Sequence, residues 1–194
     1  MPVSRRLIHF RDTGRQGKNW LLKSEWSRVF EYPLLLVFPV AMAFAGAFDL
    51  LTMTIPNRIS LTLLAAFLVA APLTGMQLPV FLTHIGVGAA VLAAGIVMFA
   101  AGWMGGGDAK LLAAATLWIG YDNLAMYLGQ VAILGGVLAV VILVYRGLPM
   151  QAFPLPGWAV RLHAKGTGIP YGLAIAGAAL KIYPETAWFA AFSA

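Results

Sequence analysis

The fold is indicated most clearly by residues 80–104, which read VFLTHIGVGAAVLAAGIVMFAAGWM and contain no Asp, Glu, Lys or Arg. A helix needs about 20 predominantly apolar residues to cross the hydrocarbon core of a bilayer. This run is long enough, and it stops at a cluster of glycines that begins at Gly105. Residues 80–104 are therefore predicted to form one membrane-spanning helix.

Further apolar runs lie on both sides of this segment. Together they give the expected helices, at residues 33–48, 59–73, 80–104, 109–119, 124–145 and 170–182. Of the 194 residues, 61% are hydrophobic and only 10% are charged, a composition that requires lipid around the chain. We expect an all-α, polytopic membrane protein with about six transmembrane helices in one domain, residues 32–194, after a basic N-terminal tail, residues 1–31.

The distribution of charge predicts both partners and orientation. The 13 Lys and Arg residues outnumber the 7 Asp and Glu residues, but most of them lie in the tail and between the apolar runs. This favours topology signals and contacts with lipid headgroups over nucleic-acid binding. Alternate crossings place Asp49, Asp108 and the 146–168 loop on one side, together with the cations Arg58, Lys110, Arg146, Arg161 and Lys165. By the positive-inside rule we expect this side to be cytoplasmic.

The basic tail argues for the opposite orientation, because an odd number of crossings separates it from these loops. We give the internal loops more weight, since the tail could lie along a surface as an amphipathic segment or be absent from the mature chain.

The chain contains no cysteine, which excludes disulfides, thiolate metal sites and cysteine nucleophiles. His84 has no cluster of other metal-ligating side chains near it in the sequence, so it is expected to be an interfacial residue. Neither a metal nor a cofactor is expected.

Asp49 directly follows the first apolar run and opens the segment Asp49-Leu50-Leu51-Thr52-Met53-Thr54-Ile55-Pro56-Asn57. An ionisable side chain at membrane depth is costly, so it needs a reason to be there. The alternative is that Asp49 only marks the membrane interface while Asn57 caps the following helix. Asp49 by itself leaves both interpretations open.

Asp108 follows three glycines in the segment Gly105-Gly106-Gly107-Asp108-Ala109-Lys110 and precedes the fourth expected helix. In the alternative to a functional role, Asp108 is an N-cap and Lys110 an anchor to headgroups. A phosphate-binding loop is a poor match, because Lys110 is followed by Leu111 rather than by Ser or Thr.

The short length of the fourth helix favours function for Asp108. A helix over residues 109–120 rises only about 18 Å, against a hydrocarbon core of roughly 30 Å. If it reaches the far face of the membrane, Asp108 lies below the near face. If the helix instead continues to Tyr127, it buries Asp122, which is therefore the reserve candidate.

Two carboxylates on the same side of a helical membrane domain suggest the arrangement of aspartic proteases, in which they share one proton because close like charges cannot both ionise. The ionised carboxylate takes a proton from water as the water attacks the peptide carbonyl, and the protonated one stabilises the oxyanion. The catalytic candidates are Asp49 and Asp108. Which is base and which is acid stays open, since the titration belongs to the pair.

Two motifs resemble the signature motifs of the type IV prepilin peptidases: Asp49 with Ile55-Pro56-Asn57, and Gly105-Gly106-Gly107-Asp108 with Lys110. The second is the Gly-x-Gly-Asp pattern that these enzymes share with presenilin-like proteases. The late segment Gly168-Ile169-Pro170-Tyr171-Gly172-Leu173-Ala174 is similar to the Pro-Tyr-Gly stretch that opens the last helix of the small, tight-adherence (CpaA or TadV) members. The resemblance covers residues 33 to about 183.

This resemblance implies a multi-pass endopeptidase of the bacterial inner membrane that removes the basic leader of type IV or Flp prepilin-like precursors at the cytoplasmic face, usually just after a glycine. It also implies the pilus assembly machinery as a further partner. Asp49 and Asp108 map onto the family's catalytic pair. Larger members add a domain with paired Cys-x-x-Cys motifs that methylates the new N-terminus; without cysteine, we expect cleavage and no methyltransferase activity.

Two other functions stay open. In a small proton- or cation-coupled transporter, Asp49 and Asp108 would bind the cation, with Lys110 or Arg58 as counter-charge. The lack of an internal repeat or an interrupted helix pair in the sequence argues against it. In a non-catalytic subunit of pilus or secretion assembly, replacing either Asp would be nearly harmless.

Overall fold

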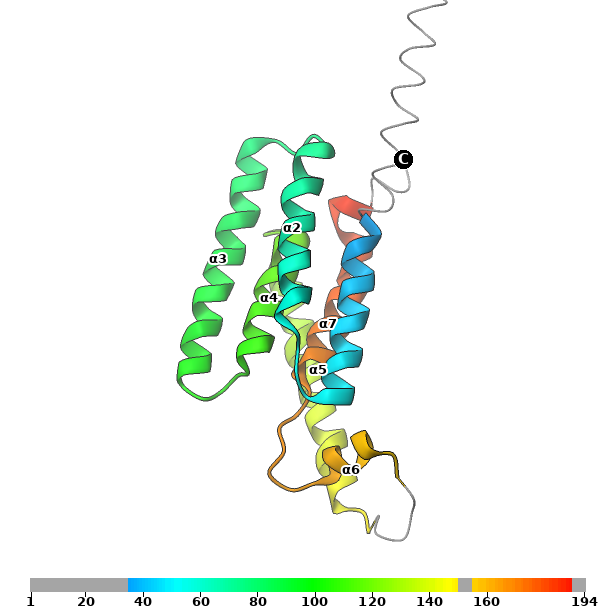
Figure 1. Ribbon diagram of the computed structural model, residues 1–194. Coiled ribbons are helices and arrows are strands. Elements are labelled where there is room, and N and C mark those ends of the chain that lie inside the picture. Colours follow the sequence, from blue (N-terminus) through cyan, green and yellow to red (C-terminus); the bar gives the residue numbers. More distant parts are fainter. Residues whose placement is uncertain (1–34, 150–154, 190–194) are drawn as a thin grey trace, which may run out of the picture.

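The computed structural model describes residues 35–149 and 155–189 (Figure 1). Within these ranges the chain is helical and has no strand, so the predicted all-α class is confirmed. The helices are Leu35–Thr52, α2 (Asn57–Leu73), α3 (Leu78–Ala100), α4 (Gly106–Ile119), α5 (Leu124–Gly147), α6 (Gly157–His163) and α7 (Tyr171–Ile182), followed by the 3-10 turn η2 (Tyr183–Glu185). The predicted basic tail, residues 1–31, lies outside the described residues.

Three of the described helices are long and apolar enough to cross a membrane: Leu35–Thr52, α3 and α5. α3 and α5 expose many large apolar side chains, as a surface in contact with lipid does. The other helices of the bundle are shorter, with 17 residues in α2, 14 in α4 and 12 in α7. A membrane protein is therefore confirmed, while the count of six spans stays a prediction.

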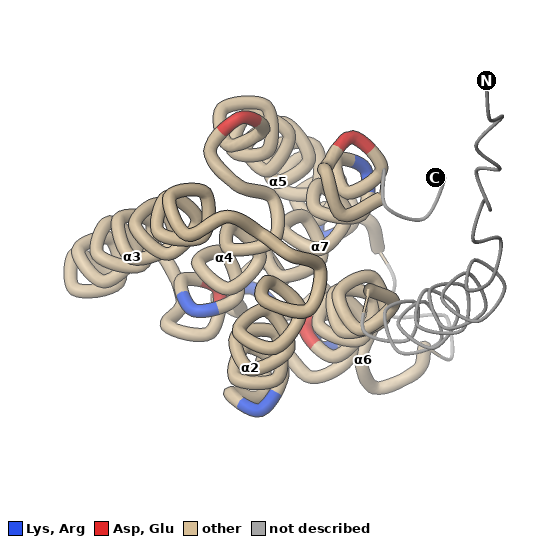
Figure 2. Tube along the Cα trace, turned by 90° about the horizontal axis from the view of Figure 1, so that it is seen from above, with Lys and Arg blue, Asp and Glu red and all other residues tan. Residues whose placement is uncertain are grey.

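α4 lies at the centre of the bundle, surrounded by α2, α3 and α7 (Figure 2). Every residue from Leu111 to Ile119 is buried. α3 approaches α4 closely at Gly95: a Cβ added there would lie 2.9 Å from the Cβ of Ala109, so a larger residue would not fit without a shift. On the α2 side, Trp118 Nε1 donates a hydrogen bond of 3.0 Å to the carbonyl oxygen of Leu63. Packing against the neighbouring helices therefore fixes the position of α4.

α3 ends at Ala100, so the predicted end at Met104 is wrong. Gly102 adopts a left-handed φ of 76°. Its amide donates to the carbonyl of Phe99, and the amide of Trp103 donates to the carbonyl of Met98. This is a Schellman motif, which ends a helix with a glycine because a side chain would be strained there. Gly102, rather than the cluster at Gly105, stops the helix.

The segment expected as a loop over residues 146–168 contains the short helix α6. Figure 1 shows α5 extending beyond the ends of its neighbours, with α6 beside this extension. The Tyr145 hydroxyl donates a hydrogen bond of 3.1 Å to the carbonyl of Ala159, and the rings of Tyr145 and His163 meet edge to face, with centroids 5.2 Å apart. α6 is therefore fixed to the last turn of α5.

Candidate active site

Asp49 lies in the last turn of the helix Leu35–Thr52 and is only 5% exposed. Its Oδ2 accepts a hydrogen bond of 2.7 Å from the backbone amide of Gly172, at the start of α7. A Cβ at Gly172 would lie 2.8 Å from this oxygen, so only glycine lets the amide approach without displacing the carboxylate. Asp49 is therefore a buried carboxylate that the Gly172 amide orients.

The helix that carries Asp49 ends at Thr52, and the next residue, Met53, has a left-handed φ of 58°. The Met53 amide still donates to the carbonyl of Asp49, at 2.8 Å. A left-handed conformation costs a residue with a side chain roughly 1–2 kcal/mol. The chain turns sharply here, and this brings Ile55 back against the bundle.

Asp108 is the third residue of α4 and is half-buried. The N-cap residue is Gly105, so the alternative that Asp108 is the N-cap is wrong. The carboxylate turns back to the Gly105 backbone, in the manner of an acid at the third position of a capping box. The first turn of a helix also favours a negative charge.

Ile55 lies between the two acid-bearing segments. A Cβ at Gly107 would lie 3.2 Å from the Ile55 Cβ, and one at Gly172 would lie 2.7 Å from the Ile55 Cδ1. Asp49 contacts the same Gly172. The structure thus brings the segments that carry the two acids together around Ile55.

Lys110 and Asn57 join the two motifs directly. Lys110 Nζ donates a hydrogen bond of 3.0 Å to Asn57 Oδ1. Asn57 is the first residue of α2, whose N-cap is Pro56, and it makes no capping hydrogen bond. The alternative that Asn57 caps this helix is therefore wrong. Instead, its amide ties the start of α2 to the first turn of α4.

Two arginines that were expected as topology signals bind backbone carbonyls of the segments around the site. Arg146 donates to the carbonyls of Leu162, Thr167 and Gly168, at 2.8 to 2.9 Å, and to the Thr167 hydroxyl at 2.8 Å. Arg161 donates to the carbonyl of Leu51, at 3.2 Å, just beyond Asp49. Arg146 thus fixes the connection that leads to Gly172, and Arg161 ties α6 to the helix that carries Asp49.

Sequence reasoning missed the roles of Arg146 and Arg161, because their acceptors are backbone carbonyls that no pattern reveals. A weak signal existed for Gly172 in the Pro170-Tyr171-Gly172 stretch. A glycine at the start of a helix can mark a place where another group approaches the backbone.

Asp122 and His84 lie at the other end of α4. α4 ends at Ile119, and Gly120 with a φ of 78° prevents its continuation, so the alternative of a helix reaching Tyr127 is wrong. Asp122 is exposed, and His84 Nδ1 lies 2.6 Å from the carbonyl oxygen of Leu117. Within residues 35–149 and 155–189, no group of three or more His, Cys, Asp or Glu side chains is placed to hold a metal.

Comparison with known families identifies the family of the chain. The type IV leader peptidase family matches residues 36–144, which is more than half of the chain and includes both acidic motifs. The chain belongs to the type IV leader peptidase family. The family places it among peptidases and confirms the resemblance to prepilin peptidases. No match was found among curated proteins or among solved structures. The matched range ends before α6 and α7, so the contact between Gly172 and Asp49 is a finding of the structure.

Proposed function

We propose that the chain is an intramembrane aspartic endopeptidase that removes the basic leader of type IV or Flp prepilin-like precursors at the cytoplasmic face of the bacterial inner membrane. One observation carries the proposal: in a peptidase-family chain, the buried Asp49 is held by the Gly172 amide, and Ile55 lies between Gly172 and Gly107, the residue before Asp108. The cations Arg58, Lys110, Arg146 and Arg161 at this end support its cytoplasmic orientation.

The proposed reaction is hydrolysis of one peptide bond. One carboxylate of the pair takes a proton from a water molecule as the water oxygen bonds to the carbonyl carbon. The other carboxyl donates a hydrogen bond to the oxyanion that develops. When the carbon–nitrogen bond breaks, the leaving amine receives a proton from the pair. The Gly172 amide holds one oxygen of Asp49 throughout, which leaves its other oxygen for water or for Asp108.

The substrate of this site would be an apolar helix preceded by a basic leader, cut where the polar leader meets the apolar helix. The proposed activity of these residues is cleavage alone, because the Cys-x-x-Cys motifs of larger members need cysteine and this chain has none. The Pro170-Tyr171-Gly172 stretch supports assignment to the small, tight-adherence type.

The test is co-expression with a Flp-type prepilin, with the size of the pilin and its new N-terminus as readouts. Asp49→Asn and Asp108→Asn should each abolish processing while the protein still inserts into the membrane. Asp122→Asn is the matched control and should process normally, because Asp122 lies exposed at the other end of α4. Normal processing by either of the first two variants would remove that residue from the mechanism and favour a transporter or assembly role.

A further inference from the structure

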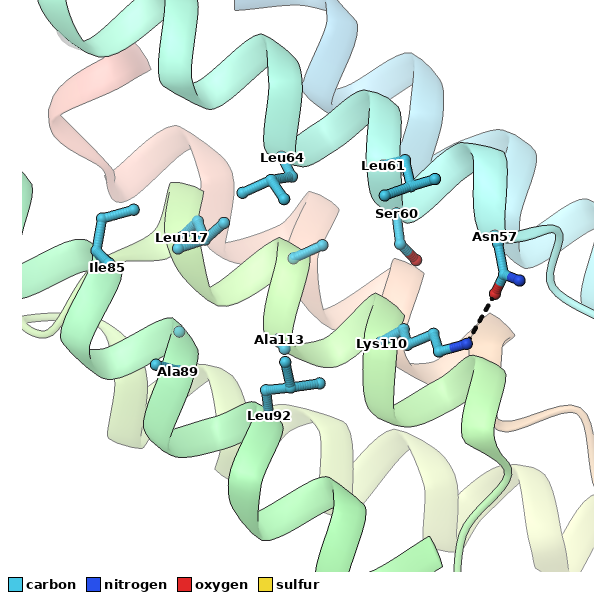
Figure 3. Close-up of a pocket in the computed structure, with 12 residues that line it drawn as sticks. Asn57, Ser60, Leu61, Leu64, Ile85, Ala89, Leu92, Lys110, Ala113 and Leu117 are labelled. Atoms are coloured by element: carbon cyan, nitrogen blue, oxygen red, sulfur yellow. Dashed lines mark hydrogen bonds between the residues drawn. The ribbon is translucent and has the colours of Figure 1, made fainter.

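A cavity of about 470 Å³ lies between α2, α3 and α4, away from the acidic pair. Figure 3 shows α4 between the two other helices, with side chains from all three turned toward the space. Most of the lining is apolar, and includes Leu64, Ile85, Ala89, Leu92 and Leu117. This space is a groove suited to an apolar chain.

One end of the groove is polar. There Asn57, Ser60 and Lys110 line the space, on the side where α2 and α4 begin (Figure 3). Lys110 is exposed, and its hydrogen-bond partner Asn57 is neutral, so its positive charge is not compensated by that contact. The Ser60 hydroxyl makes no hydrogen bond within the described part of the chain. The polar end thus offers a cation and a free donor.

We propose that the groove binds an anionic phospholipid, with one acyl chain along its apolar part and the phosphate at Lys110. The separation of an apolar slot from a cationic end matches the two halves of such a molecule. A phosphate oxygen accepts hydrogen bonds from an ammonium and from a hydroxyl, and a cation near anionic lipid is stabilised by the surface charge.

The groove shares Asn57 and Lys110 with the candidate active site but does not include the two candidate catalytic acids. Its lining residues on α4 are Lys110, Ala113, Ala114 and Leu117, whereas neither Asp49 nor Asp108 lines it. At 3.6 residues per turn, Asp108 and Lys110 point to nearly opposite sides of the helix. A bound lipid therefore leaves the acidic pair free. The lipid phosphate would share the Lys110 ammonium with Asn57. The hydrogen bond between Lys110 and Asn57, which joins the two motifs, would therefore depend on lipid composition.

The test measures lipid retention by the purified full chain. Protein in nanodiscs of equal phosphatidylglycerol and phosphatidylcholine, with identical acyl chains, is extracted into mild detergent, and the retained lipids are counted by mass spectrometry. We expect phosphatidylglycerol to be enriched about fivefold over phosphatidylcholine. Lys110→Gln should remove this preference, whereas Arg58→Gln, an exposed cation at the same end, should keep it.

A second pair of variants tests the apolar slot. Ala89→Phe fills the groove and should reduce retention of both lipids at least threefold. Its neighbour Ala90 is exposed and does not line the groove, so Ala90→Phe should retain lipid like the wild type. An unchanged headgroup preference in Lys110→Gln, or equal retention by the two Phe variants, would overturn the proposal. So would a photocrosslinker at residue 89 that captures co-expressed prepilin instead of lipid. The readout needs no peptidase activity, so the proposed function and the lipid site can fail independently.

Discussion

Replacing Gly172 by alanine tests whether the approach of its amide to Asp49 matters for catalysis. The added Cβ would lie 2.8 Å from Asp49 Oδ2, 3.0 Å from Asp49 Cβ and 2.7 Å from Ile55 Cδ1. All three distances are well below the usual carbon contact of about 3.5–4.0 Å, so Asp49 and Ile55 must move by up to about 1 Å. A displacement of about 1 Å at a catalytic group can reduce the rate 10²-fold.

Stability and activity should change for different reasons in this variant. Gly172 is the second residue of α7, and in a helix alanine is intrinsically favoured over glycine by about 1 kcal/mol. Overpacking opposes this gain by about 1–3 kcal/mol. The free energy of unfolding should therefore fall by at most about 2 kcal/mol, while kcat for prepilin cleavage falls about 100-fold.

The matched control is Gly168→Ala in the same connection. The nearest atom to its added Cβ is the Met53 Cε, at 3.8 Å, which is an ordinary contact. The assay is cleavage of purified prepilin in detergent or nanodiscs, followed by gel shift over time. Gly168→Ala should cleave within about twofold of wild type. Wild-type kcat in Gly172→Ala would refute the assignment of Asp49 as an oriented catalytic carboxylate.

Two further predictions concern positioning and packing. Arg146→Gln and Arg146→Lys should both lower kcat about tenfold with little change in KM. Lys keeps the positive charge, but its single ammonium cannot replace the guanidinium, whose separate nitrogens donate to the Leu162 and Thr167 carbonyls. Restoration of kcat by Lys would show that Arg146 acts only through its charge. Gly95→Ala should lower the thermal unfolding midpoint, since its Cβ would meet Ala109 at 2.9 Å, at a cost of about 1–3 kcal/mol. Gly86→Ala on the same helix meets open space and should leave the midpoint unchanged or higher, and equal midpoints for the two variants would contradict the close contact of α3 with α4.

The helices could be predicted largely from apolar runs, because lipid and a buried core both select for continuous apolar sequence. The exceptions have local causes. α6 has only 7 residues and follows Pro156, so no periodic pattern could establish it. The end of α3 depends on two backbone hydrogen bonds around Gly102. Several glycines lie close together here, so the sequence does not show which of them ends the helix.

The candidate acids could also be found in the sequence, because a carboxylate beside an apolar run is unusual. The contacts that surround these acids could not be predicted from the sequence. The hydrogen bond from Gly172 to Asp49 joins residues 123 positions apart, and the one from Arg161 to Leu51 spans 110. Such contacts depend on how the helices pack. The sequence around Arg146 and Arg161 does not distinguish an arginine that binds backbone carbonyls from one that only sets the topology.

The most direct test of the central claim is a double-mutant cycle on purified protein, with cleavage of one prepilin measured for Asp49→Asn, Asp108→Asn and the variant with both changes. If the two carboxylates act as one unit, each single change should reduce kcat by about 10²–10⁴-fold, and the double variant should be no slower than the slower single one. Losses that multiply in the double variant, or full activity in either single variant, would contradict a shared catalytic pair.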